Sequence, residues 1–270
     1  MLFRSFEKES GCQVNVKTYG TSDEAVQLMQ SGGYDVVSAS GDASLRLIYG
    51  GDLQPVNLDL IPNYADIFDN LKDRPWNTVD GLNYGVPHGR GANVLQYTIG
   101  KVDPAPDSWS LVWDANSPAK GKITAYDSAI YIADAAVYLM STKPELGITD
   151  PYALDQTQFD AAMELLKAQK PLVGEYWADY TKYIEAVQSG SIIAGTSWQV
   201  IANVLNGEKE TVGAVKPKEG ATGWSDTWMI SKNVEAIDCA YKWLNWIIKP
   251  DVNAQAAEWF GEAQIGRAHV

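Results

Sequence analysis

The stretch SGGYDVVSASGDASLRLI (residues 31–48) decides the fold class of this chain. Its glycine pair ends a helix, and residues 34–39 are a short apolar run typical of a buried strand. Residues 40–44 then begin another helix, which continues to residue 48. A strand that leads directly into a helix predicts that Ser40 and Asp42 lie at the carboxyl end of the strand, where α/β sheets collect their ligands.

The sequence before this stretch repeats the same order of elements. Residues 12–17 alternate like a half-buried strand. Thr21 to Glu24 form a capping-box start for a helix whose apolar residues share one face. This β-α-β-α order at short spacing predicts an α/β fold with a parallel sheet covered by helices.

Further strand-to-helix junctions follow downstream. Residues 122–125 are predicted as a strand that ends beside Asp127, and residues 191–194 as a buried strand that leads to Trp198; a helix follows each. Residues 224–230 alternate, so Trp224 and Asp226 share one face of a strand. The glycine-rich residues 88–93 join strands predicted at 82–87 and 94–97 and are typical of a crossing between lobes.

Length and charge limit the functions that the chain can have. A chain of 270 residues is too long for one simple core and favours two lobes. With 34 acidic against 21 basic residues, its formal charge of −13 repels phosphate backbones and argues against nucleic-acid binding. No apolar run reaches the ~20 residues of a membrane span, and the first residues do not form a signal peptide. The 10 Trp and 14 Tyr residues favour a site for an organic ligand.

Cys12 and Cys239 are the two cysteines of the chain. They are too few for a disulfide framework and too far apart for a short metal-binding motif. Two interpretations stay open: one long-range disulfide, if the chain is exported, or two buried thiols.

Motifs for catalysis and cofactor binding are absent from the sequence. It has no GxGxxG after a strand, no P-loop, no HExxH and no paired CxxC, so we expect no cofactor, no metal and no catalytic residue. Of the two histidines, His269 lies in a tail without periodicity. A hydrolase or acyl-transfer enzyme would therefore have to use His88, and this enzyme is the less favoured alternative.

What remains is a set of acidic and aromatic side chains in the loops after strands. Carboxylates beside aromatic faces bind protonated amines through charge-assisted hydrogen bonds and cation–π contact. A structural interpretation also exists, because Asp42 and Asp127 are favourable residues at helix N-termini. If the guanidinium of Arg90 faces the site, it favours an amine that also carries a carboxylate, such as 4-aminobutyrate.

Four segments carry a resemblance to a known family: FEKESGCQVNVKT (6–18), GGYDVVSASGDASLRLI (32–48), AYDSAIYIADAA (125–136) and KEGATGWSDTWMIS (218–231). In order and spacing they resemble the periplasmic spermidine/putrescine-binding proteins of bacterial ABC transporters, and the resemblance extends from Phe6 to about Gln264. It implies a type II periplasmic-binding-protein fold with a hinged cleft between two lobes, residues 1–91 plus 224–270 and residues 92–223. It also implies that the chain is truncated at both ends and lacks the family's first strand.

The resemblance implies a function and a set of site residues as well. The chain is expected to bind a polyamine or a related small amine reversibly, as a monomer, and to deliver it to an ABC permease in the membrane. The native, full-length form is expected in the periplasm or at the outer face of the cell membrane. Together with the positions in loops after strands, the resemblance gives the expected ligand contacts: Asp226 as the counter-charge of the amine, Trp224 as the stacking face, Asp42 and Asp127 as secondary carboxylates, and Trp198, Ser40 and Tyr131.

Overall fold

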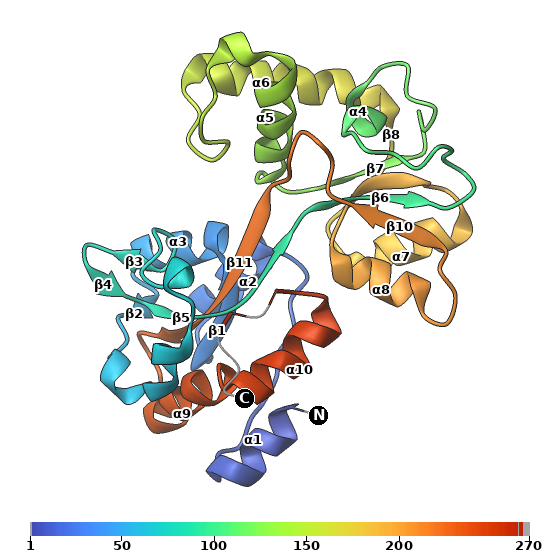
Figure 1. Ribbon diagram of the computed structural model, residues 1–270. Coiled ribbons are helices and arrows are strands. Elements are labelled where there is room, and N and C mark those ends of the chain that lie inside the picture. Colours follow the sequence, from blue (N-terminus) through green and yellow to red (C-terminus); the bar gives the residue numbers. More distant parts are fainter. Residues whose placement is uncertain (1, 264, 267–270) are drawn as a thin grey trace. The chain divides into compact units, whose positions relative to one another are not determined.

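The computed structural model describes residues 2–263, 265 and 266 (Figure 1). The chain divides into two compact units, unit 1 (Met1–Gly91 and Trp224–Val270) and unit 2 (Ala92–Gly223). The chain passes between the units twice: β5 (Gly85–Ala92) ends at the first crossing and β11 (Gly223–Ser231) begins at the second. In the part of the chain that the structure describes, no helix combines the length and the apolar character needed to cross a membrane.

Unit 1 is built on a sheet that joins strands from both ends of the chain. Its strand order is β1-β11-β2, and β5 also pairs with β11. β11 runs antiparallel to β1 and to β2. Besides β5 and β11, the elements are α1 (Leu2–Ser10), α2 (Ser22–Ser31), β1 (Val36–Ser40), α3 (Gly41–Tyr49), β2 (Leu53–Gln54), three 3₁₀ turns (Leu58–Leu60, Pro62–Asp66, Asp69–Leu71), β3 (Thr78–Val79), β4 (Leu82–Asn83), α9 (Ile237–Ile247) and α10 (Pro250–Phe260).

Three expectations for this sheet are wrong. Residues 12–17, predicted as a strand, have no strand conformation, and the neighbours of β11 whose direction is defined are antiparallel rather than parallel. An alternating pattern marks one apolar face, but a strand also needs a partner, and the partner of β1 comes from the far end of the chain. In addition, β5 continues through the glycine-rich residues that were expected to join two strands.

Helices bury the sheet of unit 1 through two hydrophobic clusters. In the first, Phe6 of α1 packs edge-on against Trp243 of α9, with 5.1 Å between the ring centroids. In the second, apolar side chains of α2 and α3 cover β1 and β11, with Leu47 and Met229 fully buried. These clusters hold the ends of β1 and β11 in place.

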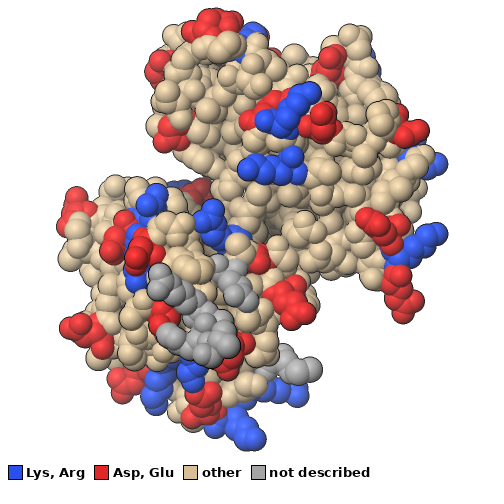
Figure 2. Space-filling view, viewed as in Figure 1, with Lys and Arg blue, Asp and Glu red and all other residues tan. Residues whose placement is uncertain are grey.

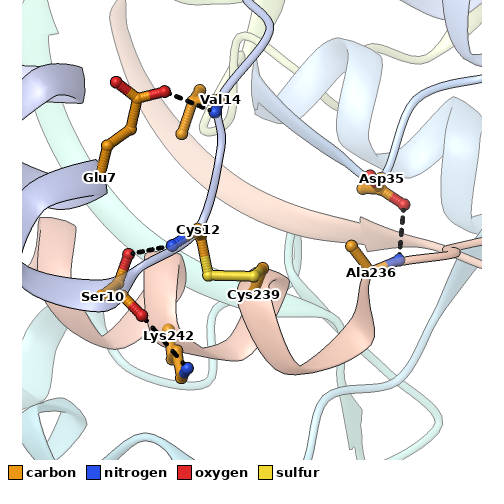
Figure 3. Close-up of a disulfide and its surroundings, with 8 residues drawn as sticks. All are labelled: Glu7, Ser10, Cys12, Val14, Asp35, Ala236, Cys239 and Lys242. Atoms are coloured by element: carbon orange, nitrogen blue, oxygen red, sulfur yellow. Dashed lines mark hydrogen bonds between the residues drawn. A yellow bond between two sulfur atoms is a disulfide. The ribbon is translucent and has the colours of Figure 1, made fainter.

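A disulfide joins Cys12 to Cys239 of α9, which confirms the first of the two interpretations of the cysteines (Figure 3). The two Cα atoms are 5.9 Å apart, and the residues are separated by 227 positions in the sequence. Next to it, the Ser10 hydroxyl accepts a hydrogen bond from the N–H of Cys12 at 3.1 Å, and Lys242 Nζ donates to the carbonyl of Ser10 at 3.4 Å. The irregular segment after α1 is thereby fixed to α9.

Unit 2 has a mixed five-stranded sheet of order β10-β6-β9-β7-β8. β7 runs parallel to β8 and β9, as expected for strands that alternate with helices, whereas β6 runs antiparallel to β9 and β10. The elements are β6 (Val94–Thr98), α4 (Ser110–Trp113), β7 (Ile123–Tyr126), α5 (Tyr131–Thr142), α6 (Gln156–Gln169), β8 (Val173–Trp177), α7 (Tyr180–Ser189), β9 (Ala194–Ser197), α8 (Gln199–Asn206), β10 (Val212–Val215) and the 3₁₀ turns Pro144–Leu146 and Lys170–Leu172.

The acidic character of the chain is spread over its surface. On the face drawn in Figure 2, Asp and Glu side chains stand among Lys and Arg side chains on both units. The excess of 34 acidic over 21 basic residues is therefore not gathered into one patch on that face.

Candidate functional site

The seven residues expected to contact a ligand divide between the two units. Four belong to unit 1 and three to unit 2: Ser40, Asp42, Trp224 and Asp226, and Asp127, Tyr131 and Trp198. Those of unit 1 are up to 186 positions apart in the sequence. The pairing of β1 with β11 brings them together.

Ser40 and Asp226 form the centre of the group in unit 1. The antiparallel register places Ser40, the last residue of β1, opposite Asp226 of β11. The Ser40 hydroxyl donates a hydrogen bond to the Asp226 carboxylate. Asp42 lies in the first turn of α3, close enough for its charge to act on Asp226. A polar group thus stands at the carboxyl end of β1, where sheets that lead into helices present their ligand contacts.

Two glycines of β5 create the room for this group. A methyl group built at Gly91 would come within 2.3 Å of Trp224 Cζ2, and one built at Gly89 would come within 1.9 Å of Glu262 Oε2. The indole and the carboxylate therefore lie directly on the backbone of β5. Residues two apart on a strand share a face, so Gly89 and Gly91 face Trp224 and Glu262 while the exposed Arg90 faces the opposite way.

Glu262 is a candidate site residue that sequence reasoning missed. It follows Gly261, which ends α10 with a left-handed backbone (φ 69°). The next residue, Ala263, donates its N–H to the carbonyl of Arg90 at 3.0 Å, and this bond ties the segment to β5. The sequence signal for Glu262 was the presence of two glycines, Gly89 and Gly91, on one face of a strand. This signal cannot be interpreted until the side chains that cover the glycines are known.

The carboxyl groups of Asp226 and Glu262 are partly buried and repel one another. Burial, together with the charge of Asp42, raises the pKa of Asp226 to about 6, against a lowering by the Ser40 hydrogen bond. Burial, and then the charge of Asp226, raises the pKa of Glu262 to about 8. No Lys or Arg among the described residues forms a salt bridge with either carboxyl group. A positively charged ligand would supply the missing partner.

Two indoles, those of Trp76 and Trp224, lie on the segments that carry this group. Trp76 packs against the backbone of Gly41 at the start of α3, where a methyl group would come within 2.9 Å of Trp76 Cβ. The Nε1 atoms of Trp76 and Trp224 are buried and have no hydrogen-bond partner in the described part of the chain. Within that part, no cluster of three or more His, Cys, Asp and Glu side chains is arranged to hold a metal ion. The group suits an organic cation with apolar surface.

The raised pKa values predict how stability depends on pH without ligand. The folded state binds more protons than the unfolded state between the ordinary pKa values (3.8 for Asp, 4.5 for Glu) and the raised ones, about 6 for Asp226 and about 8 for Glu262. Asp134, buried in unit 2 with its pKa raised to about 7, adds to the effect. His88, whose burial lowers its pKa to about 3, opposes these three groups below its ordinary value of 6.5. Three groups outweigh one, so the free energy of unfolding should still fall as the pH rises from about 4 to about 8, and less steeply below pH 6.5.

Chemical denaturation at several pH values measures this slope. Asp226→Asn and Glu262→Gln should each make the fall of the unfolding free energy with pH shallower. Each removes one carboxyl group that keeps its proton to higher pH in the folded state than in the unfolded state. Glu258→Gln, at an exposed glutamate of α10, is the matched control and should leave the slope unchanged. Parallel slopes in wild type and all variants would show that these carboxyl groups are not destabilised in the folded protein.

The group in unit 2 is aromatic. Trp198 precedes α8 and packs edge-on against Trp177 and Tyr126, with ring centroids 4.9 Å and 5.5 Å away. Trp177 is fully buried, whereas Trp198 is partly exposed. Asp127 is exposed at the end of β7, where its N–H donates to the carbonyl of Trp177 at 2.8 Å. Trp198 and Asp127 are thus both accessible, and both contact Trp177. The sequence did not indicate the supporting role of Trp177 and Tyr126.

Tyr131 lies in the core of unit 2, and its position argues against direct ligand contact. Its side chain is 3% exposed and stacks on Trp113, with 5.4 Å between the ring centroids. Its hydroxyl accepts a hydrogen bond from Gln169 Nε2 at 2.9 Å. Tyr131 is the first residue of α5, and this face of the helix packs inward, which the sequence pattern did not reveal.

His88, the residue that a hydrolase would need, lies within 2.6 Å of the Ser38 hydroxyl, measured from Nε2 to Oγ. Burial lowers the pKa of His88 to about 3, far from the value near 7 that suits a general base. The ring packs beside Trp228 with 5.4 Å between centroids, and in the described residues no carboxylate is hydrogen-bonded to it. The pair is a structural contact between β1 and β5. His269 lies outside the described residues.

Comparisons with known proteins identify the family of the chain. The family model described as bacterial extracellular solute-binding protein matches residues 1–264. The spermidine/putrescine-binding periplasmic protein of Escherichia coli (strain K12) is 26% identical over 266 residues, which cover 96% of this chain and 72% of that protein.

Solved structures share the fold. The spermidine/putrescine ABC transporter substrate-binding protein PotD from Streptococcus pneumoniae superposes with a TM-score of 0.78 at 21% identity, covering 98% of this chain and 79% of that one. The Atu4243 GABA receptor gives a TM-score of 0.72 at 20% identity, covering 98% and 77%. These likenesses confirm the expected α/β fold of type II periplasmic binding proteins.

Proposed function

The chain belongs to the bacterial extracellular solute-binding protein family, and from this premise we propose that it binds a polyamine or a related small diamine for uptake by an ABC transporter. Members of this family bind solutes rather than convert them, so the hydrolase that would use His88 is set aside. The relative from Escherichia coli is a spermidine/putrescine-binding periplasmic protein. We propose that this chain takes the same class of ligand, acts outside the cytoplasm as a monomer and delivers the ligand to a membrane permease.

One observation carries the proposal: the carboxyl groups of Asp226 and Glu262, near Trp224, have no Lys or Arg partner among the described residues. Burial raises the pKa of both carboxyl groups, the charge of Asp226 raises that of Glu262 further, and neither group has a cationic partner in the described residues, so a bound cation would stabilise both. An alkyl diamine offers a charged end to the carboxylates and methylene groups to an indole face. Asp226 would be the main counter-charge, with Ser40, Asp42 and Glu262 beside it.

Trp198 and Asp127 are the ligand contacts that we propose for unit 2. Trp198 is held on a buried aromatic support and is itself partly exposed, which suits stacking against an alkyl chain. Asp127 is an exposed carboxylate that can pair with a second ammonium group. The proposed contacts do not include Tyr131, because its ring and hydroxyl are committed to the core.

A ligand carboxylate fits this set less well than a second amine does. Arg90 could have recognised a carboxylate, as in 4-aminobutyrate, but it lies on the face of β5 opposite to Gly89 and Gly91 and is exposed. The side chains beside Trp224 are acidic. A dication is therefore favoured over a zwitterion.

Titration of the intrinsic tryptophan fluorescence with putrescine, spermidine, 4-aminobutyrate and a neutral amino acid tests the proposal. We expect saturable changes with the first two amines and none with the neutral amino acid. Because binding holds Asp226 and Glu262 ionised, calorimetry near pH 7 in buffers of different ionisation enthalpy should show proton release, and affinity should rise from pH 6 to pH 8. Preference for 4-aminobutyrate, or affinity that falls over this pH range, would contradict the proposal.

A further inference from the structure

A chain of hydrogen bonds runs through unit 2 behind Trp198. The indole Nε1–H of Trp198 donates to Asn93 Oδ1 at 3.1 Å, and the side-chain amide of Asn93 donates to Thr222 Oγ1 at 2.6 Å. The Thr222 hydroxyl donates in turn to Asp134 Oδ1 at 2.9 Å. Each of the first three groups donates a hydrogen bond to the group that follows it. The bonds therefore all point in one direction, from the indole to the carboxylate.

The far end of this chain is anchored in the core. Asp134 of α5 is 6% exposed and Thr222 is 3% exposed. A buried carboxylate is unfavourable unless it accepts hydrogen bonds, so the interaction with Asp134 holds the Thr222 hydroxyl in one orientation. A fixed hydroxyl oxygen then gives the Asn93 amide a single favourable position.

Asn93 and Thr222 lie where the chain crosses between the units. Asn93 stands between β5 and β6, and Thr222 directly precedes β11. Their backbones are joined as well, because the N–H of Asn93 donates to the carbonyl of Thr222 at 3.0 Å. Both crossings therefore set the position of the acceptor for the Trp198 indole, and the segment between β9 and α8 that carries Trp198 does not.

The aromatic contacts of the indole restrain its orientation only in part. Trp177 and Tyr126 pack edge-on against the ring, which restrains the tilt of its plane but does not fix which edge of the indole points towards Asn93. The hydrogen bond to Asn93 is the directional contact of this ring among the described residues. We propose that Asn93 and Thr222 are positioning residues that fix the Trp198 indole in the orientation required for stacking on the ligand, which rests on the proposed role of Trp198 as a ligand contact.

Replacing Thr222 tests the inference, because Thr222 reaches Trp198 only through Asn93. Thr222→Val keeps the shape of the side chain and removes the hydroxyl, and Thr222→Ser restores the hydroxyl. Thr142→Val, at an exposed threonine near the end of α5, is the matched control. The first readout is the ¹⁵N–¹H resonance of the Trp198 indole in the ligand-free protein, assigned from its loss in Trp198→Phe. The second is the Kd for putrescine.

Thr222→Val should shift the Trp198 indole resonance and raise the Kd for putrescine about three- to tenfold, as expected for loss of one ordering hydrogen bond. Thr222→Ser should restore both values. If Thr222→Val does not fold, Asn93→Ala removes the acceptor itself and should produce the same two changes. An unshifted resonance, or a shifted resonance with unchanged Kd, would overturn the inference.

The two readouts separate this inference from the proposed function. The resonance is measured without ligand, so the hydrogen-bond chain is tested even if no amine binds. Failure of the wild-type protein to bind putrescine and spermidine would refute the proposed function and with it the part of the inference that concerns stacking. Binding by wild type with no change in Thr222→Val and Asn93→Ala would refute the positioning role alone.

Discussion

Asp226→Asn is expected to weaken putrescine binding about 100-fold, because removing one member of a desolvated charge pair costs about 2–5 kcal/mol. The asparagine keeps the shape of the side chain and can still accept the hydrogen bond from Ser40. The substitution also removes a carboxylate that is unfavourable in the ligand-free protein, so stability should not fall at pH 8. Calorimetry and thermal unfolding of the same samples separate affinity from stability.

Asp238→Asn is the matched control for this substitution. Asp238 is an exposed aspartate in the first turn of α9 in unit 1. The control variant should bind putrescine like the wild-type protein. If Asp226→Asn binds within about threefold of wild type, the ammonium group of the ligand does not pair with Asp226, and the proposed site is wrong.

Breaking the Cys12–Cys239 disulfide is expected to produce the largest loss of stability. A native cross-link that closes a long loop contributes about 2–5 kcal/mol to the free energy of unfolding, because it restricts the unfolded chain. Here the bridge spans 227 positions and fixes an irregular segment to α9. The double variant Cys12→Ser, Cys239→Ser should unfold roughly 10 °C below the oxidised protein.

Reduction provides the control for this prediction. A reducing agent should lower the unfolding temperature of the wild-type protein towards that of the double variant and should leave the double variant unchanged. Equal unfolding temperatures for oxidised and reduced wild-type protein would show that the bridge does not stabilise the fold. The putrescine affinity of the double variant should remain close to wild type, because Asp226 and Glu262 lie on segments that the bridge does not carry.

Local patterns in the sequence predicted the elements whose signals lie within them. The strand and helix expected over residues 34–48 correspond to β1 and α3. Likewise α6 begins directly after Asp155, which forms a capping box with Gln158. Pairing partners were less predictable, because they are distant in sequence. The strand expected at 191–194 is β9 (Ala194–Ser197), three residues later, since its register is set by β6 and β7.

Predicting the site had the same limit. Ser40 and Asp226 could be selected as candidates because each stands at a recognisable place on a strand, and the structure places them opposite one another. Glu262 could not be found, because a backbone bond between Ala263 and Arg90 brings it to β5. Tyr131 follows a predicted strand and also fits the resemblance, but the phase of α5 turns it into the core. Which face of a helix packs inward depends on neighbours that a single sequence does not reveal.

The division of the chain has a consequence for the order in which the protein folds during synthesis. Unit 2 is one continuous stretch, whereas the sheet of unit 1 needs β11 from the far side of that stretch. During synthesis, all of unit 2 leaves the ribosome before β11 is available to pair with β1. Unit 2 can therefore fold before the sheet of unit 1 forms. A chain that terminates before residue 223 would leave β1 without β11, and its exposed backbone would favour aggregation.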